Sequence, residues 1–467
     1  MTTFCKAFLT GFFIIGGFLT ATAQQKKVNA WLTDPGRSVF FEKQVQLPLS
    51  KKINGDKTVI TIDDKKRYQS IDGFGFSLTG GSAGHIVKMS AASRAALLNE
   101  LFGTKGKNIG TSYLRISIGA SDLNDHVFSY DDLPDGQTDT AMQHFDLGPD
   151  RKDVIPVLKE ILAINPDIKI MGSPWSPPVW MKTNNDTRGG SLKPGFYRAY
   201  AKYFVRYIRE MKKEGIRIDA VTVQNEPLHP GNNPSLLMLA PDQAIFIKDH
   251  LGPAFTSAGI KTKIIIYDHN ADRSDYPISI LNDTGANKYI DGSAFHLYGG
   301  TIDALSKVHN AHPGKHIYFT EQWVGAPGNF NKDIPNHIRD LIIGATRNWS
   351  RTVLEWNLAA DPASNPHTDR GGCDRCLGAV TIDKDKVKRN PAYYIIAHAA
   401  KFVRPGSIRI ASDTSDGLPN VAFKTPAEKI VVIVHNDSKE ERTFELRLKN
   451  KRFTTTLNAG AVGTYIY

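Results

Sequence analysis

Two glutamates occupy positions from which the chain could carry out acid–base and nucleophilic chemistry. Glu226 lies in Val-Gln-Asn-Glu-Pro at 223–227, and Glu321 lies in Tyr-Phe-Thr-Glu-Gln-Trp at 318–323. Each follows a short, β-branched apolar run and precedes a loop, which places each carboxylate where a parallel strand ends. Taken alone, a glutamate after a strand is more often a cap or an ion-pair partner. Two carboxylates that converge at one edge can instead supply the proton donor and the nucleophile or base that cleavage of a glycosidic bond needs.

Strand-like runs and amphipathic helical runs alternate along most of the chain. The expected strands are 70–78, 111–118, 168–172, 220–224, 263–267, 293–298, 316–320 and 352–356. Helices are expected between them and after the last, at 92–102, 153–164, 196–214, 241–258, 302–311, 334–349 and 392–403. Eight strands with intervening helices predict a (β/α)8 TIM barrel. On this count Glu226 ends the fourth strand and Glu321 the seventh, and the barrel brings these two strand ends to face each other.

The end of the chain has strands without helices. They are expected at 408–410, 421–424, 430–435, 443–448, 454–457 and 464–467. The segment 30–62 is also strand-like, and we expect it to pair with the C-terminal strands. The predicted fold is therefore α/β, with a catalytic barrel over 67–403. An antiparallel β-sandwich built from 24–66 and 404–467 accompanies it.

Residues 1–23 have the features of a cleavable secretory signal: Lys6 is their only charged side chain, and Ala21-Thr22-Ala23 closes an apolar stretch. We expect cleavage after Ala23 and a secreted or periplasmic protein; an uncleaved membrane anchor is the alternative. No other segment could cross a bilayer, so no stable membrane insertion is expected after cleavage. The formal net charge is +11, but the basic residues are scattered without interleaved aromatics, which argues against a nucleic acid partner.

Cys373 and Cys376 are the two cysteines that remain after the signal. In an oxidising compartment this pair is expected to close a small disulfide loop. A redox motif would stand at a helix start after a strand, whereas this pair lies in a loop rich in Pro, Gly and Asp. A zinc site would need a second ligand pair. The sequence shows no motif for a cofactor or a metal ion.

Several short motifs follow one another along the chain. They include Asp-Gly-Phe-Gly at 72–75, Leu-Arg-Ile-Ser at 114–117, Ser-Pro-Trp-Ser-Pro-Pro at 173–178, Phe-His-Leu-Tyr at 295–298 and Glu-Trp-Asn-Leu at 355–358. With the segments around Glu226 and Glu321 they resemble, in this order, glycoside hydrolase family thirty, which includes glucosylceramidase and β-1,6-glucanases; the motif at 173–178 is the most specific. The resemblance implies a retaining enzyme with Glu226 as acid/base and Glu321 as nucleophile. A general acid must stay protonated near neutral pH, so we expect burial and an ionised Glu321 to raise the pKa of Glu226.

Eight further residues are candidates for binding the substrate. Three are aromatic platforms for a sugar face, Trp175, Trp323 and Trp356. The polar candidates are Arg115, Asp122, Asn225, His296 and Tyr298. We expect Arg115 to hold Glu321 ionised, Asn225 to bind the sugar 2-hydroxyl, and His296 and Tyr298 to donate to the nucleophile and a ring hydroxyl. Structural ion pairing, plain loop positions and core packing are the alternatives for these residues.

Two departures from glucosylceramidase bear on the substrate, a β-linked glycan. Leu297 and Trp323 replace other residues in the motifs, and the loop 361–376 is polar. Both favour the secreted β-1,6-glucanase branch over ceramide lipids. The alternatives are a β-glucosidase or glucosylceramidase, a xylosidase or β-1,6-galactanase, and a non-catalytic glycan-binding protein. The sequence leaves the oligomeric state open.

Overall fold

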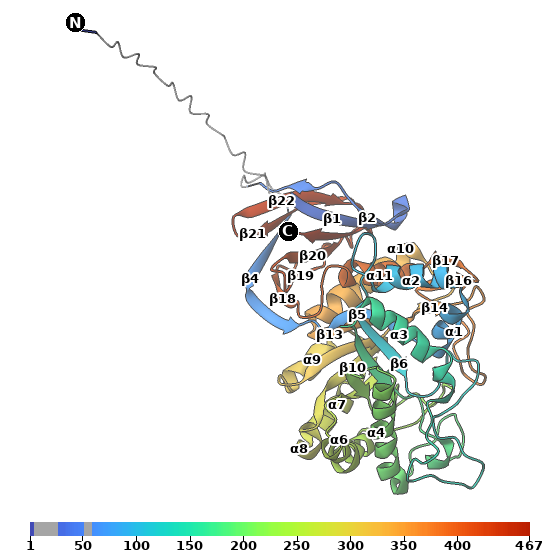
Figure 1. The fold of residues 1–467 in the computed structure, drawn as a ribbon. Helices are drawn as coiled ribbons and strands as arrows, with labels where there is room; N and C mark the ends of the chain where they lie inside the picture. Colours follow the sequence, from blue (N-terminus) through green and yellow to red (C-terminus); the bar gives the residue numbers. More distant parts are fainter. Residues whose placement is uncertain (4–26, 51–57) are drawn as a thin grey trace.

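The computed structural model describes residues 1–3, 27–50 and 58–467. A barrel of parallel strands ringed by helices lies against a sheet structure that is built from both ends of the chain (Figure 1). The expected signal at 1–23 falls, apart from residues 1–3, outside the described residues and stays a prediction. Among the described residues, no helix combines the length and the apolar character that a bilayer crossing requires.

Eight strands form the barrel, and they correspond to the eight expected from the sequence. They are β5 (Gly73–Leu78), β6 (Tyr113–Ser117), β7 (Lys169–Ser173), β8 (Ala220–Thr222), β9 (Lys263–Ala271), β10 (Ile290–Gly300), β11 (His316–Glu321) and β13 (Ser350–Asn357). They pair in parallel around a closed circuit, β10-β11-β13-β5-β6-β7-β8-β9. The predicted barrel is confirmed.

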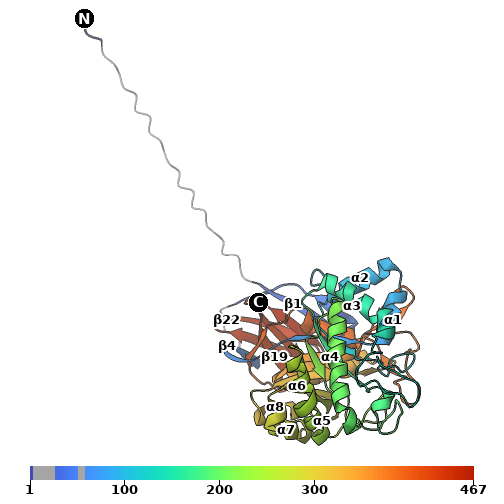
Figure 2. The same cartoon turned by 60° about the horizontal axis from the view of Figure 1, so that its bottom comes forward.

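Helices surround the barrel between these strands (Figure 2). They are α1 (Gly80–Lys88), α2 (Ala91–Phe102), α3 (Val154–Ile164), α4 (Tyr197–Lys213), α5 (Ala240–Phe246), α6 (Gly252–Ser257), α7 (Asp275–Asn282), α8 (Thr284–Asn287), α9 (Ala304–Ala311), α10 (Phe330–His337) and α11 (Pro391–Ala400). The helix expected over 241–258 is interrupted by a π-helical turn, Ile247–Leu251, between α5 and α6. Pro253 lies at the start of α6 and has no N–H to continue the i→i−4 pattern, which explains the wider turn.

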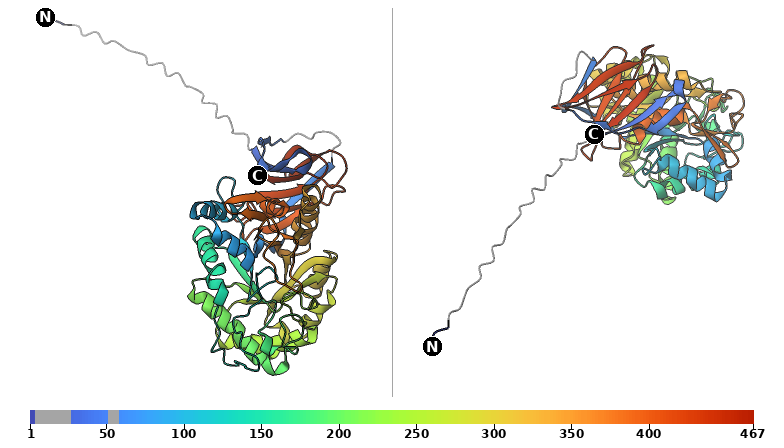
Figure 3. Two further views of the ribbon diagram at one scale, coloured as in Figure 1. Left: turned by 90° about the vertical axis from the view of Figure 1, so that its right-hand side faces the viewer. Right: turned by 90° about the horizontal axis from the view of Figure 1, so that it is seen from above.

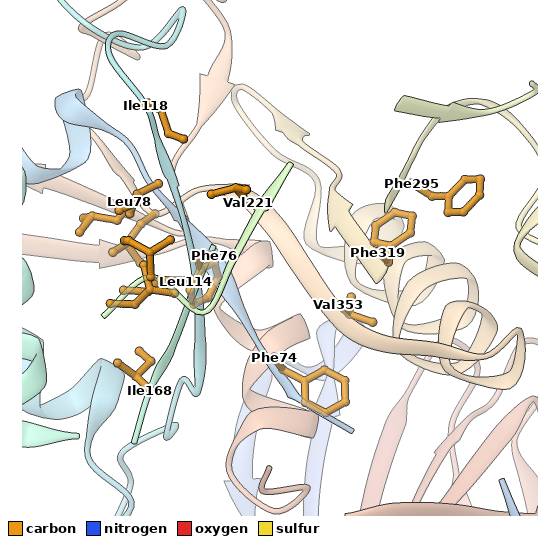
Figure 4. Packing of buried hydrophobic residues seen from close by; sticks show 14 of the residues in the cluster. Phe74, Phe76, Leu78, Leu114, Ile118, Ile168, Val221, Phe295, Phe319 and Val353 are labelled. Atoms are coloured by element: carbon orange, nitrogen blue, oxygen red, sulfur yellow. The ribbon is translucent and has the colours of Figure 1, made fainter. Parts of the chain in front are cut away.

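Two separate apolar layers lie on the two faces of the barrel strands. Outward side chains belong to the large apolar cluster that includes the surrounding helices; Figure 4 shows several of its residues, among them Phe76, Leu114 and Phe319. A second cluster draws one side chain from each of seven strands and fills the interior: Tyr113, Met171, Ala220, Ile265, Ala294, Tyr318 and Leu354. The eighth strand, β5, contributes Gly75 to this region. A side chain would not fit there, because a Cβ on Gly75 would come within 1.9 Å of the Tyr113 carbonyl oxygen.

The interior becomes polar two residues further along most of these strands. Side chains alternate between the faces of a strand, so residues i and i+2 share a face. The inward positions that follow the apolar layer are Arg115, Ser173, Thr222, His296, Thr320 and Trp356. The fold therefore builds a polar layer at the C-terminal ends of the strands, directly above an apolar plug.

Both ends of the chain contribute strands to the β-sandwich. Its strands are β1 (Lys27–Asp34), β2 (Val39–Lys43), β3 (Leu47–Pro48), β4 (Thr58–Ser70), β18 (Ile408–Ser412), β19 (Asn420–Lys424), β20 (Ile430–His435), β21 (Arg442–Leu448), β22 (Lys451–Leu457) and β23 (Val462–Ile466). Their order is β2-β1-β23-β20-β19-β18-β4-β21-β22, with β3 on β1. The N-terminal strands thus lie among the C-terminal ones, as expected (Figure 3). One pair differs from the expected antiparallel pattern, because β4 runs parallel to β21.

The sheet structure packs directly on the barrel. Along β20, Val432 and Val434 face the sandwich core, while Val431 and Ile433 join the large cluster that includes the barrel and its helices. His398 of α11 links the two parts, with its ring nitrogens 2.8 Å from the Thr464 hydroxyl and 2.7 Å from the Thr33 hydroxyl. Burial lowers the pKa of His398 to about 3, so this contact is made by a neutral imidazole.

Candidate active site

The polar layer depends on two departures from regular backbone. Tyr267 and Asp268 both have positive φ, 71° and 63°, where the β9–β10 register shifts. Such a bulge can re-aim a side chain, and here Asp268 makes its contacts within the polar layer. Glu226, four residues past the end of β8, has φ 43°. Its N–H donates to the Asp268 carbonyl oxygen at 2.9 Å. Non-glycine residues with positive φ are costly and cluster at functional sites.

Glu321 is bound through both of its carboxylate oxygens. Arg115 Nη1 donates to Oε2 at 2.6 Å, and the Tyr298 hydroxyl donates to Oε1 at 3.0 Å. Burial raises the pKa of Glu321, and the nearby Glu226 carboxylate adds to that, while His296 and Arg115 oppose it. Burial and the two glutamates also raise the pKa of Tyr298, so its hydroxyl keeps the proton that it donates.

Arg115 is fully buried and joins four side chains. Besides Glu321, its guanidinium donates to Asp268 at 2.9 Å, to Asn225 Oδ1 at 2.6 Å and to Ser173 at 3.1 Å. Burial lowers the pKa of Arg115, but the Asp268 and Glu321 carboxylates raise it by more. Arg115 is therefore a permanent cation beneath Glu321, in the position the sequence predicted for it.

Glu226 has different partners from Glu321. His296 Nδ1 lies 3.1 Å from its Oε1, and His269 Nδ1 lies 3.8 Å from the same atom. Burial raises the pKa of Glu226, but the neighbouring imidazoles of His269 and His296 lower it by more. The expectation of a raised Glu226 pKa is therefore wrong for the free protein, because two imidazoles act on this carboxyl as well as one carboxylate.

The imidazole of His296, beside Glu226, has a raised pKa. Burial lowers the pKa of His296, but Glu321, Asp268 and Glu226 raise it to about 9. His296 Nε2 contacts Asp268 Oδ1 at 3.2 Å, so its other nitrogen faces Glu226. One proton can therefore be shared between Glu226 Oε1 and His296 Nδ1.

This charge arrangement predicts a pH-dependent stability. The pKa of His296 is raised from 6.5 to about 9, so the charged imidazole stabilises the folded state. This contribution is fully present below about pH 6.5 and is lost as the pH rises through about 9. The contribution is on the order of 3 kcal/mol. We expect the difference in free energy of unfolding between wild type and His296→Gln to be largest near pH 6 and to close toward pH 10. Denaturant unfolding across this range measures it, and a difference that does not vary with pH would contradict the assignment.

Asp268 is the central residue that the sequence analysis did not single out. It accepts hydrogen bonds from Arg115, Ser173, Thr222 and Thr320, and it contacts His296. Burial raises its pKa, but Arg115 and His296 lower it well below its usual range. Its position at the C-terminal end of a predicted barrel strand was the signal that could have found it.

A cavity of about 310 Å³ lies over this layer. Of the ten predicted catalytic and substrate-binding residues, eight line it: Asp122, Trp175, Asn225, Glu226, Tyr298, Glu321, Trp323 and Trp356. The other two, Arg115 and His296, are buried and hold the carboxylates. His229, Asn232, His269 and Asn270 also line the cavity and were not predicted.

Burial, then Glu321 and Glu226, raise the pKa of Asp122 to about 7, so this side chain exchanges a proton near neutrality.

The three tryptophans play unequal parts in the cavity wall. Trp175 and Trp356 stack on each other with ring centroids 5.3 Å apart, and both are almost fully buried. The Arg115 guanidinium lies 4.8 Å from the Trp175 ring centroid. Trp323 is only partly buried. The structure thus leaves Trp323 as the ring with most surface for a sugar, while Trp175 and Trp356 pack around Arg115.

Cys373 and Cys376 form a disulfide beside this cavity. Cys376 begins β15 (Cys376–Leu377), which pairs with β12 (Val324–Gly325), the strand that follows Trp323. The disulfide loop after β13 is therefore attached to the loop that carries Trp323.

Removing the disulfide should affect binding more than stability. The loop it closes is very short, so its entropic contribution is below the roughly 3 kcal/mol of a 15-residue loop. We expect Cys373→Ser with Cys376→Ser to shift the melting temperature little and to raise KM, because the cavity wall loses its brace. Two reactive thiols in wild-type protein purified without reductant would contradict the bond.

Comparisons with known proteins show the family of the chain. Residues 71–403 match the glycosyl hydrolase family 30 TIM-barrel domain, and residues 406–465 match the beta sandwich domain of the same family. An endo-1,6-β-D-glucanase of Aspergillus fumigatus is 35% identical over 404 residues, 81% of each chain. Lysosomal acid glucosylceramidase of Mus musculus is 30% identical over 443 residues, 88% of this chain and 84% of the mouse protein.

A solved endo-β1,6-glucanase structure shares the fold with a TM-score of 0.88. It is 34% identical to this chain, and the match covers 94% of this chain and 99% of that one. The two matched domains, the relatives and the common fold lead to one conclusion: the chain belongs to glycosyl hydrolase family 30 and is a glycoside hydrolase.

Proposed function

We propose that this glycoside hydrolase cleaves β-1,6-glucan by double displacement, with Glu321 as nucleophile and Glu226 as acid/base. One observation carries the assignment of roles. The two carboxyls line one cavity but differ in their hydrogen-bond partners, the Arg115 cation for Glu321 and the His296 imidazole for Glu226. A nucleophile benefits from a partner that holds it ionised, whereas an acid/base needs a partner with which it can exchange a proton.

The first step forms a covalent glycosyl-enzyme. A Glu321 oxygen attacks the anomeric carbon, the bond to the leaving oxygen breaks, and Glu226 transfers a proton to that oxygen. The proton comes from the hydrogen bond that Glu226 shares with His296. Asn225 accepts from Arg115 through Oδ1, and its Nδ2 has no partner among the described residues, so this amide can donate to the sugar 2-hydroxyl.

The second step releases the sugar with its original anomeric configuration. Once Glu321 is esterified it carries no charge, so the site favours an ionised Glu226. That carboxylate takes a proton from water, the water oxygen attacks the anomeric carbon, and Glu321 leaves. This route requires the two carboxyl groups to lie about 5–5.5 Å apart.

The β-1,6 linkage rests on similarity and on the shape of the site. Relatives described as endo-1,6-β-D-glucanases are 35% identical to this chain over 404 and 398 aligned residues, and a solved structure of that activity superposes over nearly all of it. The disulfide-braced loop and Trp323 line the cavity. A β-1,6 bond adds a rotatable C5–C6 link, so such a chain can bend into a recess that a flat β-1,4 ribbon cannot enter.

A panel of β-1,6-, β-1,3- and β-1,4-glucans tests the linkage. We expect oligosaccharide release from β-1,6-glucan and little from β-1,4 chains. The second candidate, glucosylceramide hydrolysis, is favoured by the 30% identity with lysosomal acid glucosylceramidase. Hydrolysis of glucosylceramide in detergent, without sugar release from β-1,6-glucan, would replace the proposal by this candidate.

Trp323 is expected to contribute to substrate binding by stacking on a sugar ring. Trp323→Ala should reduce kcat/KM on β-1,6-glucan oligomers by at least about tenfold, since aromatic contacts add roughly 1 kcal/mol beyond their buried area. Trp349→Ala is the matched control, because Trp349 packs on His309 and Tyr68, away from the cavity. Equal losses in both variants would argue against a platform.

Export of the protein is part of the proposal. The expected signal at 1–23 is followed by a chain whose two remaining cysteines form a disulfide, and disulfides persist in oxidising compartments. N-terminal sequencing of the exported protein should begin at Gln24.

A further inference from the structure

A second set of ligand-type side chains lies in the long loop between β6 and α3, apart from the catalytic carboxylates. Asp131, Asp139 and His144 each place one potential ligand atom within 4.8 Å of the other two. Neither the hydrolysis mechanism nor the cavity lining uses them. The loop also carries Asp122 into the cavity, so it links this group to the active site.

Asp131 lacks the partners that a buried carboxylate needs. The residue is only 1% exposed, and neither Oδ1 nor Oδ2 has a hydrogen-bond partner among the described residues. Asp139 is different, because it accepts from the N–H groups of Ala141 at 3.1 Å and His144 at 2.7 Å. Buried polar groups are nearly always satisfied, and an unpaired buried carboxylate is among the most costly exceptions. A positively charged ligand would remove this cost.

We propose that Asp131, Asp139 and His144 bind a divalent transition-metal ion such as Zn²⁺. Two carboxylate oxygens with an imidazole nitrogen form a mixed oxygen and nitrogen donor set, which suits zinc better than calcium or magnesium. The His144 side chain is 67% exposed and Nδ1 lies 3.2 Å from Asp139 Oδ2, so an ion can enter from solvent by replacing this contact.

A cation here would hold two active-site loops together. The backbone carbonyl of Asp131 accepts a hydrogen bond from Trp180 Nε1 at 2.9 Å, and Trp180 belongs to the loop after β7. Fixing Asp131 therefore also fixes the contact between the β6 and β7 loops. The role assigned to the ion is structural and contributes no step to the hydrolysis.

The test must separate this site from the catalytic residues. Glu226, His269 and His296 also place ligand atoms within 4.8 Å of one another, so they could bind zinc as well. Titrations are therefore made in the full-length His269→Ala protein, treated with EDTA and dialysed, by calorimetry with ZnCl₂ and by melting temperature. We expect one saturable zinc equivalent and a rise in melting temperature.

Three further substitutions in the His269→Ala background decide the outcome. Asp131→Asn should abolish saturable binding, and His144→Ala, at an exposed position, should weaken it about tenfold or more. Asp135→Asn, which removes an exposed carboxylate of the same loop, should bind as the background does. Absence of zinc binding in the background, or undiminished binding with Asp131→Asn, would overturn the site.

Two other results would also overturn it. A proton on Asp131 is the competing explanation for its missing partners. In that case the Asp131→Asn variant would be at least as stable as the His269→Ala background protein, and zinc would raise the melting temperature of neither protein. Tighter binding of CaCl₂ than of ZnCl₂ would reject the assigned class of ion.

Discussion

Replacing Glu321 by alanine is expected to abolish hydrolysis, with a loss in kcat of about 10⁴-fold or more. The substitution removes the group that forms the covalent intermediate and leaves space beside Arg115, which loses its partner at 2.6 Å. Azide should enter this space and restore turnover of an activated β-glycoside. Because azide attacks once and directly, the glycosyl azide should have the inverted, α configuration, which NMR of the product determines.

A matched control is available on a neighbouring barrel strand. Glu355 of β13 is also a buried strand glutamate, but it faces His337 at 2.8 Å and does not line the cavity. Glu355→Gln should retain kcat. If Glu321→Ala kept its activity, or if azide restored activity with retained configuration, Glu321 would not be the nucleophile.

Replacing Glu226 by alanine is expected to have an effect that depends on the leaving group. Natural glycosides need protonation of the departing oxygen, so their turnover should fall by about 10²–10⁴-fold. Aryl glycosides with good leaving groups need little protonation and should still form the glycosyl-enzyme rapidly. Their turnover should then be limited by the second step, which lacks its base.

Pre-steady-state measurement on a dinitrophenyl β-glycoside shows this difference directly. A burst of phenolate followed by slow turnover is expected in Glu226→Ala, and the slow phase should speed up with azide. The resulting glycosyl azide should have the β configuration, opposite to that from Glu321→Ala. If the two variants responded the other way round, the roles of the two glutamates would be exchanged.

The sequence was sufficient to predict which side chains meet where their placement follows from strand position. Glu321 ends the seventh strand and Glu226 follows the end of the fourth, and a closed parallel barrel brings such ends together. The fold was predicted because alternating strands and helices leave a clear period in the sequence, whereas the family was indicated by the resemblance of short motifs such as Ser-Pro-Trp-Ser-Pro-Pro at 173–178.

The residues that the sequence analysis missed are placed by irregular backbone, which leaves no periodic pattern in the sequence. Asp268 reaches the polar layer through a bulge with positive φ at two non-glycine residues, which strand alternation does not predict. The lowered pKa of Glu226 depends on His269, which comes from another strand. Asp131, Asp139 and His144 meet only through the path of an irregular loop, so their spacing in the sequence carries no signal.

The anomeric configuration of the first product from β-1,6-glucan tests the central claim most directly. Proton NMR recorded within the first minutes of the reaction, before mutarotation, identifies the reducing-end anomer of the released oligosaccharides. Double displacement through Glu321 predicts that the β anomer appears first and the α anomer grows later. Initial release of the α anomer would contradict the mechanism, and no release from this substrate would contradict the proposed linkage.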